Sequence, residues 1–406
     1  MTPKGPLTGI RIMDFTWVMA GPHGTCVLGD LGAEVIKIEG RVFDRDGPRA
    51  KFFSLRNRNK LAISLNMRHP KGLEIAKRLL KISDGVIENF SAGVLERWGF
   101  GYEVMKSIKP DIIYVSMAGF GHSGPYRDYV SHGMTLHALS GFTYLSGVPG
   151  DIPLCTNSYA DPTGGMNAAI AMLAAIEHRQ QTGNGQHIDL AQLESNLAVL
   201  DTAFLDYFTN GTEPQPTANR LPHPASTPHG AYRCAGEERW IAISVFNERQ
   251  WQALCSVMGN PEWIQALQFA TMLQRVKNAD ELDRRLEEWT VTQTAEELME
   301  KLQALGVPAG VVQNAQDLFE KDEHMRARGF WEWAEDHVFG LTPFEGQPIR
   351  MSNAQCGVRR GAPLFGEHNY YVYHDLLGMS KEEIEQRKAE GVFGEPLLSA
   401  PRGAGT

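Results

Sequence analysis

Residues 9–39 read GIRIMDFTWVMAGPHGTCVLGDLGAEVIKIE, and this stretch decides the fold class. Gly9–Phe15 is a largely apolar run of strand length, and Glu34–Glu39 is a second one. Between them the Gly21-Pro22 pair opens a helix that extends to Leu31, since proline is tolerated in the first helical turn. Two strands and a helix within about thirty residues predict a βαβ unit, the start of a doubly wound parallel sheet.

A dinucleotide site is the first function to consider for such a unit, with Glu39 binding a ribose. That fingerprint requires Gly-x-Gly-x-x-Gly at the first turn, whereas this turn carries only Gly21-x-x-Gly24. The sequence therefore argues against NAD binding at this turn.

The alternation of strands and helices continues along the chain. Further strands are predicted at residues 62–65, 85–88, 112–117 and 186–190, with helices at 70–81, 93–98 and 102–108 and one long helix at 193–208. Ligands of such sheets lie beyond the carboxyl ends of the strands. Arg41, Arg68 and Arg97 stand near those ends, which suits a phosphate-bearing ligand, although each taken singly is more typical of a solvated surface charge.

Changes of composition divide the chain into segments. We assign residues 1–224 to a large Rossmann-like domain, and residues 225–330 to a smaller α/β domain with strands at 240–245 and 310–312. Residues 331–406 form the remainder. The segment 210–230 holds five prolines and little apolar pattern, so it is either a linker or a lid over an active site.

Composition argues against several classes of function. A net charge of −9 and a pI near 5.8 disfavour nucleic acid, whose phosphates require clustered cations. The sequence has no apolar run of membrane-spanning length and no signal-peptide pattern at its start, so we expect a cytoplasmic protein without a membrane partner. The five cysteines and 13 histidines are scattered without metal-binding spacing, so we expect no metal.

Asp161 is the residue that we single out for chemistry. It precedes Pro162 and the pair Gly164-Gly165 at the head of an alanine-rich helix that runs through Ile176. We expect Asp161 at the N-cap and Pro162 at the first helical position. The plainer interpretation is that Asp161 only caps this helix. The functional interpretation is an ionised carboxylate at a positive helix end, beside glycine amides that could stabilise an oxyanion.

Taken in order, the motifs of the chain resemble those of the family III CoA-transferases, the group of formyl-CoA transferase, carnitine CoA-transferase and their racemase relatives. No single motif is specific, but the ordered set is, and it covers nearly the whole chain. The matching motifs are residues 14–22 (DFTWVMAGP), 31–39 (LGAEVIKIE), 88–90 (ENF), 97–99 (RWG), 119–125 (GFGHSGP), 160–165 (ADPTGG), 183–189 (GNGQHID) and 363–368 (PLFGEH).

The resemblance implies a fold and an activity. It implies a large domain built from both chain ends, a smaller inserted domain, and two interlocked subunits, either two copies of this chain or one copy with a related subunit. Asp161 matches the family's nucleophile. It would move coenzyme A from an acyl-CoA donor such as succinyl-CoA to a carboxylic acid, through aspartyl anhydride and aspartyl-CoA thioester intermediates.

The resemblance also implies a set of CoA-binding positions. They fall on Val18, Met19, Ala20, Arg41, Leu65, Asn66, Met67, Arg68, Asn89, Phe90, Arg97 and His132. The formyl-CoA enzymes carry a glutamine where Met19 stands, so oxalate and formate are disfavoured and a larger, partly apolar acid is favoured. The residues around Trp17 resemble the aromatic-acid branch, of which benzylsuccinate CoA-transferase is an example.

Two other functions stay open at this point. His132 precedes Ala-Leu-Ser-Gly141 at the spacing found in the racemase relatives, where this histidine exchanges an α-proton opposite the aspartate. His132 and Asp161 could therefore form an acyl-CoA racemase, or His132 could orient CoA or have a structural part. Glu248 stands one position away from the racemase glutamate, which argues against that activity. The third function is a non-catalytic partner subunit of a heteromeric transferase, against which the presence of Asp161 argues.

Overall fold

The computed structural model describes residues 5–40, 48–154, 159–221 and 226–394. The chain forms two compact units. The first comprises residues 1–142, 155–201 and 324–406, and the second comprises residues 143–154 and 202–323. Our assignment of domains to residues 1–224, 225–330 and 331–406 stays a prediction about independently folding parts, which contacts alone do not test.

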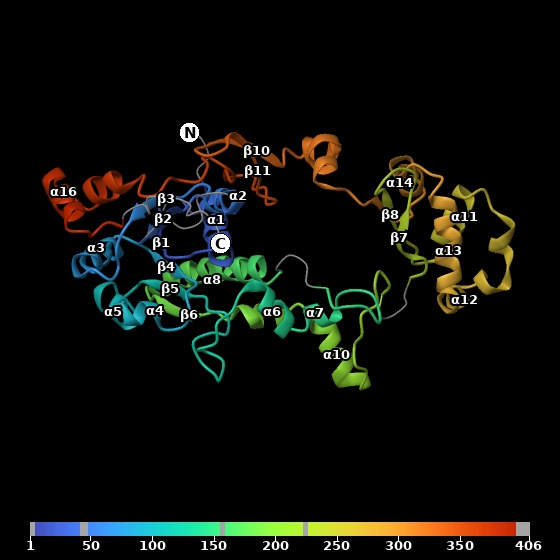
Figure 1. Ribbon diagram of the computed structural model, residues 1–406, viewed down its shortest axis with the longest axis horizontal. Helices are drawn as coiled ribbons and strands as arrows, with labels where there is room; N and C mark the ends of the chain where they lie inside the picture. The colour runs from blue at the N-terminus through green and yellow to red at the C-terminus, as the bar shows by residue number, and fades with distance from the viewer. Residues whose placement is uncertain (1–4, 41–47, 155–158, 222–225, 395–406) are drawn as a thin grey trace, which may run out of the picture. The chain divides into compact units, whose positions relative to one another are not determined.

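A six-stranded parallel sheet forms the centre of the first unit, in the order β3-β2-β1-β4-β5-β6 (Figure 1). The order reverses between β1 and β4, as in doubly wound folds. The strands are β1 (Arg11–Asp14), β2 (Glu34–Glu39), β3 (Leu61–Ser64), β4 (Gly85–Glu88), β5 (Ile113–Ser116) and β6 (Gln186–Asp189). The predicted α/β fold with a Rossmann-like parallel sheet is thereby confirmed.

Helices cover both faces of this sheet, because neighbouring residues of each strand point to opposite faces. In β1, Ile12 belongs to the buried cluster under α1 (Ala20–Asp30) and α8 (Ala160–Thr182). Met13 belongs to the cluster on the other face, with α3 (Pro70–Lys81), α5 (Tyr102–Ile108) and C-terminal residues up to Phe393. Burying each large apolar side chain contributes roughly 1.5–3 kcal/mol to folding.

The other elements of the first unit, and those at its boundaries, are short. They are α2 (Pro48–Asn57), α4 (Val94–Arg97), α6 (Gly133–Leu139), α7 (Phe142–Leu145), α9 (Gln192–Leu197), α10 (Asp201–Asn210), α15 (Glu323–Ala327), β10 (Trp331–Asp336), β11 (Gly340–Glu345), η4 (Tyr371–Leu376) and α16 (Lys381–Ala389). The single helix predicted at residues 193–208 was wrong, since α9 ends at Leu197. A tight turn follows, in which Leu200 N–H donates to Leu197 O at 3.0 Å, and Asp201 starts a new helix.

The second unit is built on an antiparallel three-stranded sheet in the order β7-β8-β9. Apolar residues of β8, such as Ile241 and Ile243, pack with Leu282 and Leu298 of the helices. Its elements are β7 (His229–Arg233), β8 (Trp240–Ser244), α11 (Glu248–Val257), η1 (Glu262–Gln265), η2 (Leu267–Phe269), α12 (Met272–Lys277), α13 (Ala279–Thr290), α14 (Ala295–Ala304), β9 (Ala309–Val311) and η3 (Asp317–Lys321).

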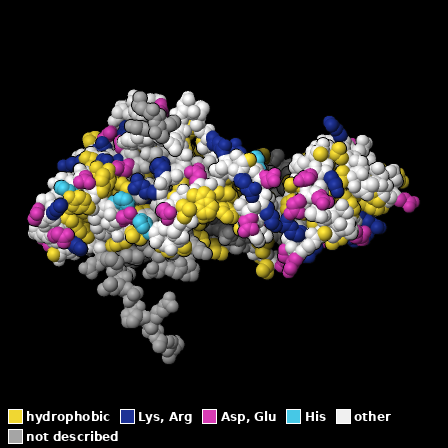
Figure 2. Space-filling model, turned by 90° about the horizontal axis from the view of Figure 1, so that it is seen from above, with side chains coloured by type: hydrophobic (Ala, Val, Ile, Leu, Met, Phe, Trp, Pro, Cys, Tyr) yellow, Lys and Arg dark blue, Asp and Glu magenta, His cyan; other side chains and the backbone are white. Residues whose placement is uncertain are grey.

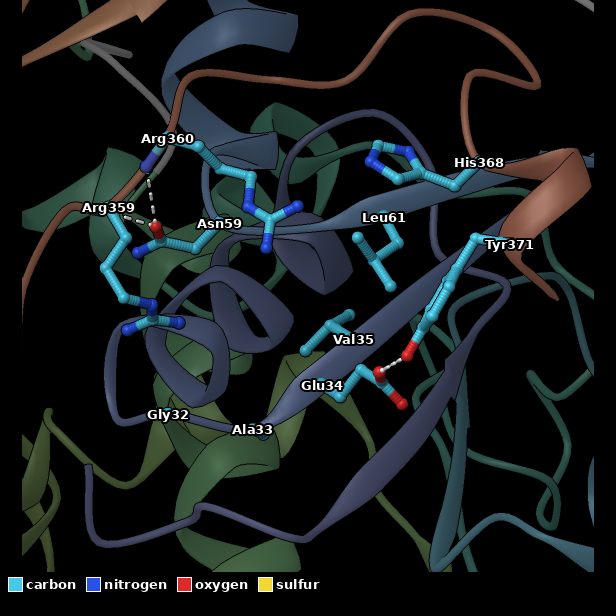
Figure 3. A pocket seen from close by; sticks show the side chains of 10 residues that line it. All are labelled: Gly32, Ala33, Glu34, Val35, Asn59, Leu61, Arg359, Arg360, His368 and Tyr371. Carbon is cyan, nitrogen blue, oxygen red and sulfur yellow. Dashed lines mark hydrogen bonds between the residues drawn. The ribbon is translucent and has the colours of Figure 1, made fainter. Parts of the chain in front are cut away.

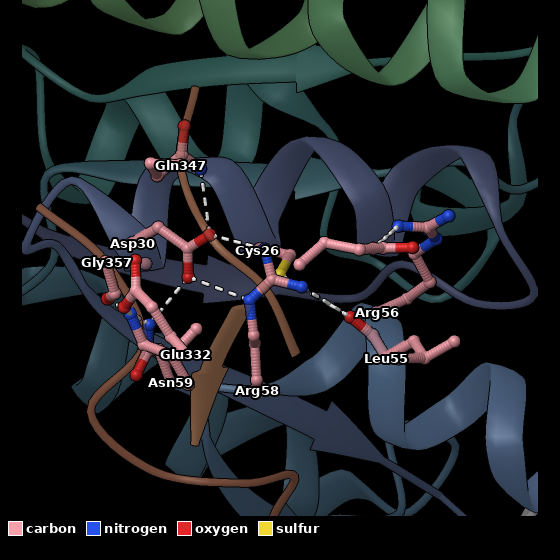
Figure 4. Close-up of polar contacts among 12 residues, drawn as sticks. Cys26, Asp30, Leu55, Arg56, Arg58, Asn59, Glu332, Gln347 and Gly357 are labelled. Carbon is pink, nitrogen blue, oxygen red and sulfur yellow. Dashed lines mark hydrogen bonds and ion pairs between the residues drawn. The ribbon is translucent and has the colours of Figure 1, made fainter. Parts of the chain in front are cut away.

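The C-terminal segment packs against the first βαβ unit around Asp30 (Figure 4). Asp30 is fully buried and accepts hydrogen bonds from Arg58 Nη2 at 2.7 Å, Asn59 Nδ2 at 2.6 Å and Gln347 Nε2 at 2.8 Å. Asn59 also donates to Gly357 O at 2.9 Å. A buried carboxylate with a guanidinium partner and further donors is well compensated. This network joins residues that are 317 positions apart (Asp30 and Gln347) and 298 positions apart (Asn59 and Gly357).

Candidate functional site

The carboxyl ends of β1 and β4 lie side by side where the strand order reverses, which is where parallel sheets bind ligands. Asp14 pairs with Ile87 in register, and Phe15 N–H donates to Ile87 O at 2.9 Å. The turn after each strand starts from this shared edge. Five of the predicted CoA contacts therefore gather here, namely Val18, Met19, Ala20, Asn89 and Phe90.

The side chain of Asn89 joins the two turns. Its Oδ1 accepts the Trp17 N–H at 2.8 Å, and its Nδ2 donates to Trp17 O at 3.0 Å. The next residue, Val18, has φ +61° and is 51% exposed. A β-branched residue in the left-handed region is strained, at a cost of about 1–3 kcal/mol, and persists only where its surroundings hold it. The two hydrogen bonds of Asn89, the residue that follows β4, keep the turn in this conformation.

Buried charges lie beneath the same turn. Lys60 Nζ is 3.0 Å from Asp14 Oδ2 and donates to Pro22 O at 3.1 Å, while Lys37 Nζ donates to Thr16 O at 2.7 Å. Burial lowers the pKa of Lys60 to about 8, although Asp14 acts in the opposite direction. Burial alone would raise the pKa of Asp14, but Lys60 and Lys37 hold that pKa below its ordinary value. The backbone around the turn is thus fixed from inside.

Asp161 is the second residue of α8, after the cap residue Tyr159 and Ala160. The predicted N-cap position was wrong, since the helix begins two residues earlier. Pro162 does not oppose this start, because N–H groups of the first helical turn have no partner within the helix. Asp161 stays within the first turn, where the helix dipole favours its ionised form by about 0.3–1 kcal/mol.

Helices α1 and α8 cross in backbone contact at two glycines. A Cβ atom on Gly24 would lie 2.5 Å from Gly165 O, and one on Gly165 would lie 2.4 Å from Ala20 O. No side chain fits at either position. Gly165 is therefore buried in the helix contact, where the second turn of α8 meets the first turn of α1, and Asp161 lies about one helical turn before Gly165.

Four predicted CoA contacts follow β3, at the same edge of the sheet. Leu65 and Met67 are buried, Asn66 is half-buried and Arg68 is exposed. Asn66 Oδ1 accepts the Arg68 N–H at 3.1 Å. Because β3 is two strands away from β1, these residues lie roughly 10 Å to the side of the β1 turn. An extended ligand is needed to reach both places.

The remaining predicted positions are more scattered. Arg97 is exposed at the end of α4 and donates to Ala92 O at 3.3 Å. His132 is exposed and directly precedes α6, and its backbone N–H donates to Thr135 Oγ1 at 2.9 Å. Helix α6 packs against α8, so His132 and Asp161 belong to neighbouring helices. Arg41 lies outside the described residues.

A separate cavity of about 440 Å³ lies at the opposite, amino-terminal ends of β2 and β3 (Figure 3). Tyr371 hydroxyl donates to Glu34 Oε1 there at 2.8 Å, and the Arg360 and His368 side chains also line it. Ligands of parallel sheets bind at the carboxyl ends of the strands, so we do not assign the substrate to this cavity.

Sequence reasoning missed the buried polar groups beneath the site. Lys37, Lys60 and Glu88 are all less than 10% exposed. Lys37 and Glu88 belong to motifs that carried the resemblance, but a sequence does not reveal whether a charged residue in such a motif points inward. Lys60 stands in Arg58-Asn59-Lys60, which looks like an exposed basic run.

The described residues show neither a surface of one charge sign in the view of Figure 2 nor a metal-binding group of side chains. On the face shown in Figure 2, cationic and anionic side chains are interspersed. Within the described ranges, no three or more His, Cys, Asp or Glu side chains are grouped so that they could hold a metal ion. None of the helices in these ranges combines the length and the apolar character that crossing a bilayer requires.

Comparisons with known proteins agree on one family. The family model described as CoA-transferase family III matches residues 7–369. The chain is 32% identical over 400 residues to the succinyl-CoA–L-malate CoA-transferase beta subunit of Chloroflexus aurantiacus, covering 96% of this chain and 98% of that protein. It is 32% identical over 403 residues to the succinyl-CoA–D-citramalate CoA-transferase of the same organism, covering 96% and 99%. A crystal structure of a CAIB/BAIF family protein from Brucella suis superposes with a TM-score of 0.84 at 31% identity, covering 92% of this chain and 100% of that one.

Proposed function

The chain belongs to CoA-transferase family III, and from this premise we propose that it transfers CoA from succinyl-CoA to a larger carboxylic acid, with Asp161 as the nucleophile. The observation that carries this proposal is the contact between Gly24 and Gly165. It joins α8, which carries Asp161 about one turn before Gly165, to the start of α1, which follows the strained Val18 turn. This supports a carboxylate close to the strand ends, where parallel sheets bind ligands.

The proposed reaction proceeds through covalent intermediates on Asp161. The carboxylate attacks the donor thioester carbonyl and the C–S bond breaks. CoA departs as a thiolate, and the donor acyl group stays on Asp161 as a mixed anhydride. The thiolate then attacks the aspartyl carbonyl, which releases the donor carboxylate and forms an aspartyl-CoA thioester. The acceptor carboxylate attacks this thioester to give a second anhydride and thiolate, and the thiolate takes the acceptor acyl group. Asp161 returns as a carboxylate, and no net proton is exchanged.

CoA is proposed to lie along the strand ends, with contacts at the β1, β3 and β4 turns. The net charge of the chain is −9, so attraction of the anionic CoA phosphates has to come from local groups. Backbone amides of the turns and the exposed Arg68 and Arg97 are the proposed local donors. The segment 210–230, of which residues 222–225 lie outside the described residues, remains our candidate for a lid that keeps water from the anhydride, with a plain linker as the alternative.

The acceptor is proposed to be a partly apolar acid, for example an aromatic acid such as benzylsuccinate. Trp17, Val18 and Tyr159 are 40–51% exposed at the β1 turn and at the start of α8, which favours an apolar group on the substrate. The relatives named above act on malate and citramalate, so these acids are the alternatives. Competition among benzylsuccinate, malate and citramalate for CoA from succinyl-CoA separates the candidates by kcat/KM.

The alternative activity, acyl-CoA racemisation, rests on the exposed His132 beside helix α8. A racemase needs a single substrate and exchanges the α-proton with solvent. Incubation of an acyl-CoA in deuterated water without any acceptor acid distinguishes the two activities. Deuterium at the α-carbon would support the racemase, and acceptor-dependent formation of a new thioester supports the transferase.

The nucleophile is tested by trapping it. Incubation with succinyl-CoA and hydroxylamine should convert Asp161 to a hydroxamate, detected as a mass change in the peptide that contains it. The matched control is Asp128→Asn, which alters an exposed carboxylate of the same unit and should leave the modification in place. A hydroxamate on another residue, or none during turnover, would refute the mechanism.

A further inference from the structure

A buried carboxyl group lies directly under the Asn89–Phe90 turn. Glu88 is the last residue of β4 and is 2% exposed. Its Oε2 accepts the Phe90 N–H at 2.6 Å, and its Oε1 accepts the Tyr114 hydroxyl at 3.1 Å. Glu88 therefore holds the turn from the strand on one side, while Asn89 holds Trp17 on the other.

No lysine or arginine of the described residues forms an ion pair with Glu88. Among the described residues, the one basic group within ion-pair range is His122, whose Nε2 lies 3.8 Å from Glu88 Oε1. That Nε2 is buried and makes no hydrogen bond. Since a buried carboxylate without a cation is costly, burial favours the protonated form of Glu88. In agreement with this, burial raises the pKa of Glu88 to about 8.

The other titratable groups around this pair do not supply a cation. His187 stacks on Tyr114 with ring centroids 4.8 Å apart, and burial lowers the pKa of His187, which favours its neutral form. Asp189 accepts the backbone N–H of His122 at 3.0 Å. Glu96 on α4 adds negative charge, which raises the pKa of Glu88 further after the effect of burial.

We propose that Glu88 is a positioning residue of the acyl-CoA site and that binding of CoA depends on the proton of its carboxyl group. With the proton in place, the Asn89–Phe90 turn rests on an uncharged carboxyl group. Without it, a bare negative charge lies under the turn that receives the anionic CoA thioester, and repulsion weakens binding. The inference rests on the proposed position of CoA at the β1–β4 edge.

The test is the pH dependence of KM for the acyl-CoA donor, measured together with kcat from about pH 6.5 to about pH 9.5. For the natural chain, we expect KM to rise by about three- to tenfold over this range while kcat changes little. Glu88→Gln should remove this rise, leaving KM constant within about twofold. Glu88→Ala should raise KM at every pH, because the Phe90 N–H loses its acceptor. Glutamine keeps an acceptor oxygen, so Glu88→Gln should have a lower KM than Glu88→Ala.

Glu103→Gln is the matched control, because it neutralises an exposed carboxylate on α5 that is not among the groups shifting the pKa of Glu88, and it should follow the natural pH curve. The pKa of Lys60, about 8, falls in the same pH range, so a rise in KM of the natural chain does not by itself identify Glu88. The decisive quantity is the difference in KM between Glu88→Gln and the natural chain. If Glu88→Gln does not fold, Tyr114→Phe serves instead. It removes a hydrogen bond that lowers the pKa of Glu88, so the midpoint of the KM curve should move to higher pH.

Infrared spectra give an independent readout. A protonated carboxyl band should vanish over the pH range in which KM rises, and it should be absent from Glu88→Gln.

The proposal is overturned if Glu88→Gln keeps the natural pH curve while Asn89→Ala raises KM. If Asn89→Ala leaves KM unchanged, the position of CoA is itself wrong, and the inference falls with it.

Discussion

At the scale of single residues, the proposed chemistry depends on an ionised Asp161. The first turn of α8 favours that form, because unpaired N–H groups and the helix dipole stabilise negative charge there. A carboxylate at this position is a ready nucleophile without a neighbouring general base. This differs from hydroxyl nucleophiles, which need a base to remove their proton.

Asp161→Asn should therefore abolish transfer. It keeps the size of the side chain but removes the attacking oxygen charge, so we expect kcat to fall by more than about a thousandfold. Binding of acyl-CoA, measured by calorimetry, should change little because the strand-end turns are untouched. A variant that retained a tenth of the natural turnover would contradict the mechanism.

Val18 offers a stability test of the strained turn. Its left-handed backbone costs an L-residue about 1–2 kcal/mol, which glycine does not incur. Val18→Gly should raise the free energy of unfolding by about 1 kcal/mol relative to Val18→Ala, as measured by urea denaturation. The control is Val130→Gly, at an exposed residue whose φ is not positive, which should give no stabilisation. A lower stability of Val18→Gly than of Val18→Ala would show that the turn is unstrained.

Glu88 should also make stability depend on pH. Burial raises its pKa in the folded chain from 4.5 to about 8, so the folded chain binds more protons than the unfolded chain between these values. The free energy of unfolding should fall as the pH rises from 4.5 to about 8, by an amount on the order of a few kcal/mol at most. Glu88→Gln should remove this fall. The prediction is contradicted if the free energies of unfolding of Glu88→Gln and of the natural chain differ by the same amount at pH 5 and at pH 8.

At the scale of elements, the crossing of α1 and α8 decides where the nucleophile lies. Gly165→Ala places a Cβ 2.4 Å from Ala20 O, so the helices must separate, and we expect a loss of stability of about 1–3 kcal/mol. Transfer should fall at the same time because Asp161 moves. Gly164→Ala is the matched control. Its Cβ would meet only the flexible Gln192 side chain, 3.1 Å away at Cγ, and the variant should unfold at nearly the natural temperature.

The same pair of variants tests the expected oxyanion role of the glycine amides. Both substitutions keep the backbone N–H. A drop in kcat for Gly164→Ala with intact stability would locate the oxyanion beside that residue. Full activity of both variants would refute the importance of this crossing.

The elements show what could be predicted from the sequence and what could not. The βαβ unit at residues 9–39 and the strands that follow were predicted because apolar runs bounded by Gly and Pro are local signals. The start of α8 was misplaced by two residues, since Asp161 and Pro162 fit several positions of a first turn equally well. The charged layer of Lys60 and Asp14 was not predicted, because it forms only when residues 46 positions apart meet inside the fold.

At the scale of the whole molecule, the proposed assembly is a pair of interlocked subunits. A purified sample should sediment at twice the chain mass of 45.1 kDa. Dilution should not separate such a pair, because unlinking requires unfolding. A mass that falls with concentration would exclude interlocking. One relative is named a beta subunit, so inactivity of the pure protein, restored by a related chain, would indicate a heteromer.

Two residues that follow the second unit, Tyr373 and Val392, complete the edge at which CoA is proposed to bind. Val392 O accepts the Asn66 N–H at 2.8 Å, and Tyr373 hydroxyl donates to Ser64 O at 2.7 Å. These residues leave the ribosome after all six strands of the parallel sheet have emerged. A nascent polypeptide that has not yet released residue 392 therefore lacks the finished edge at which the thioester is proposed to bind.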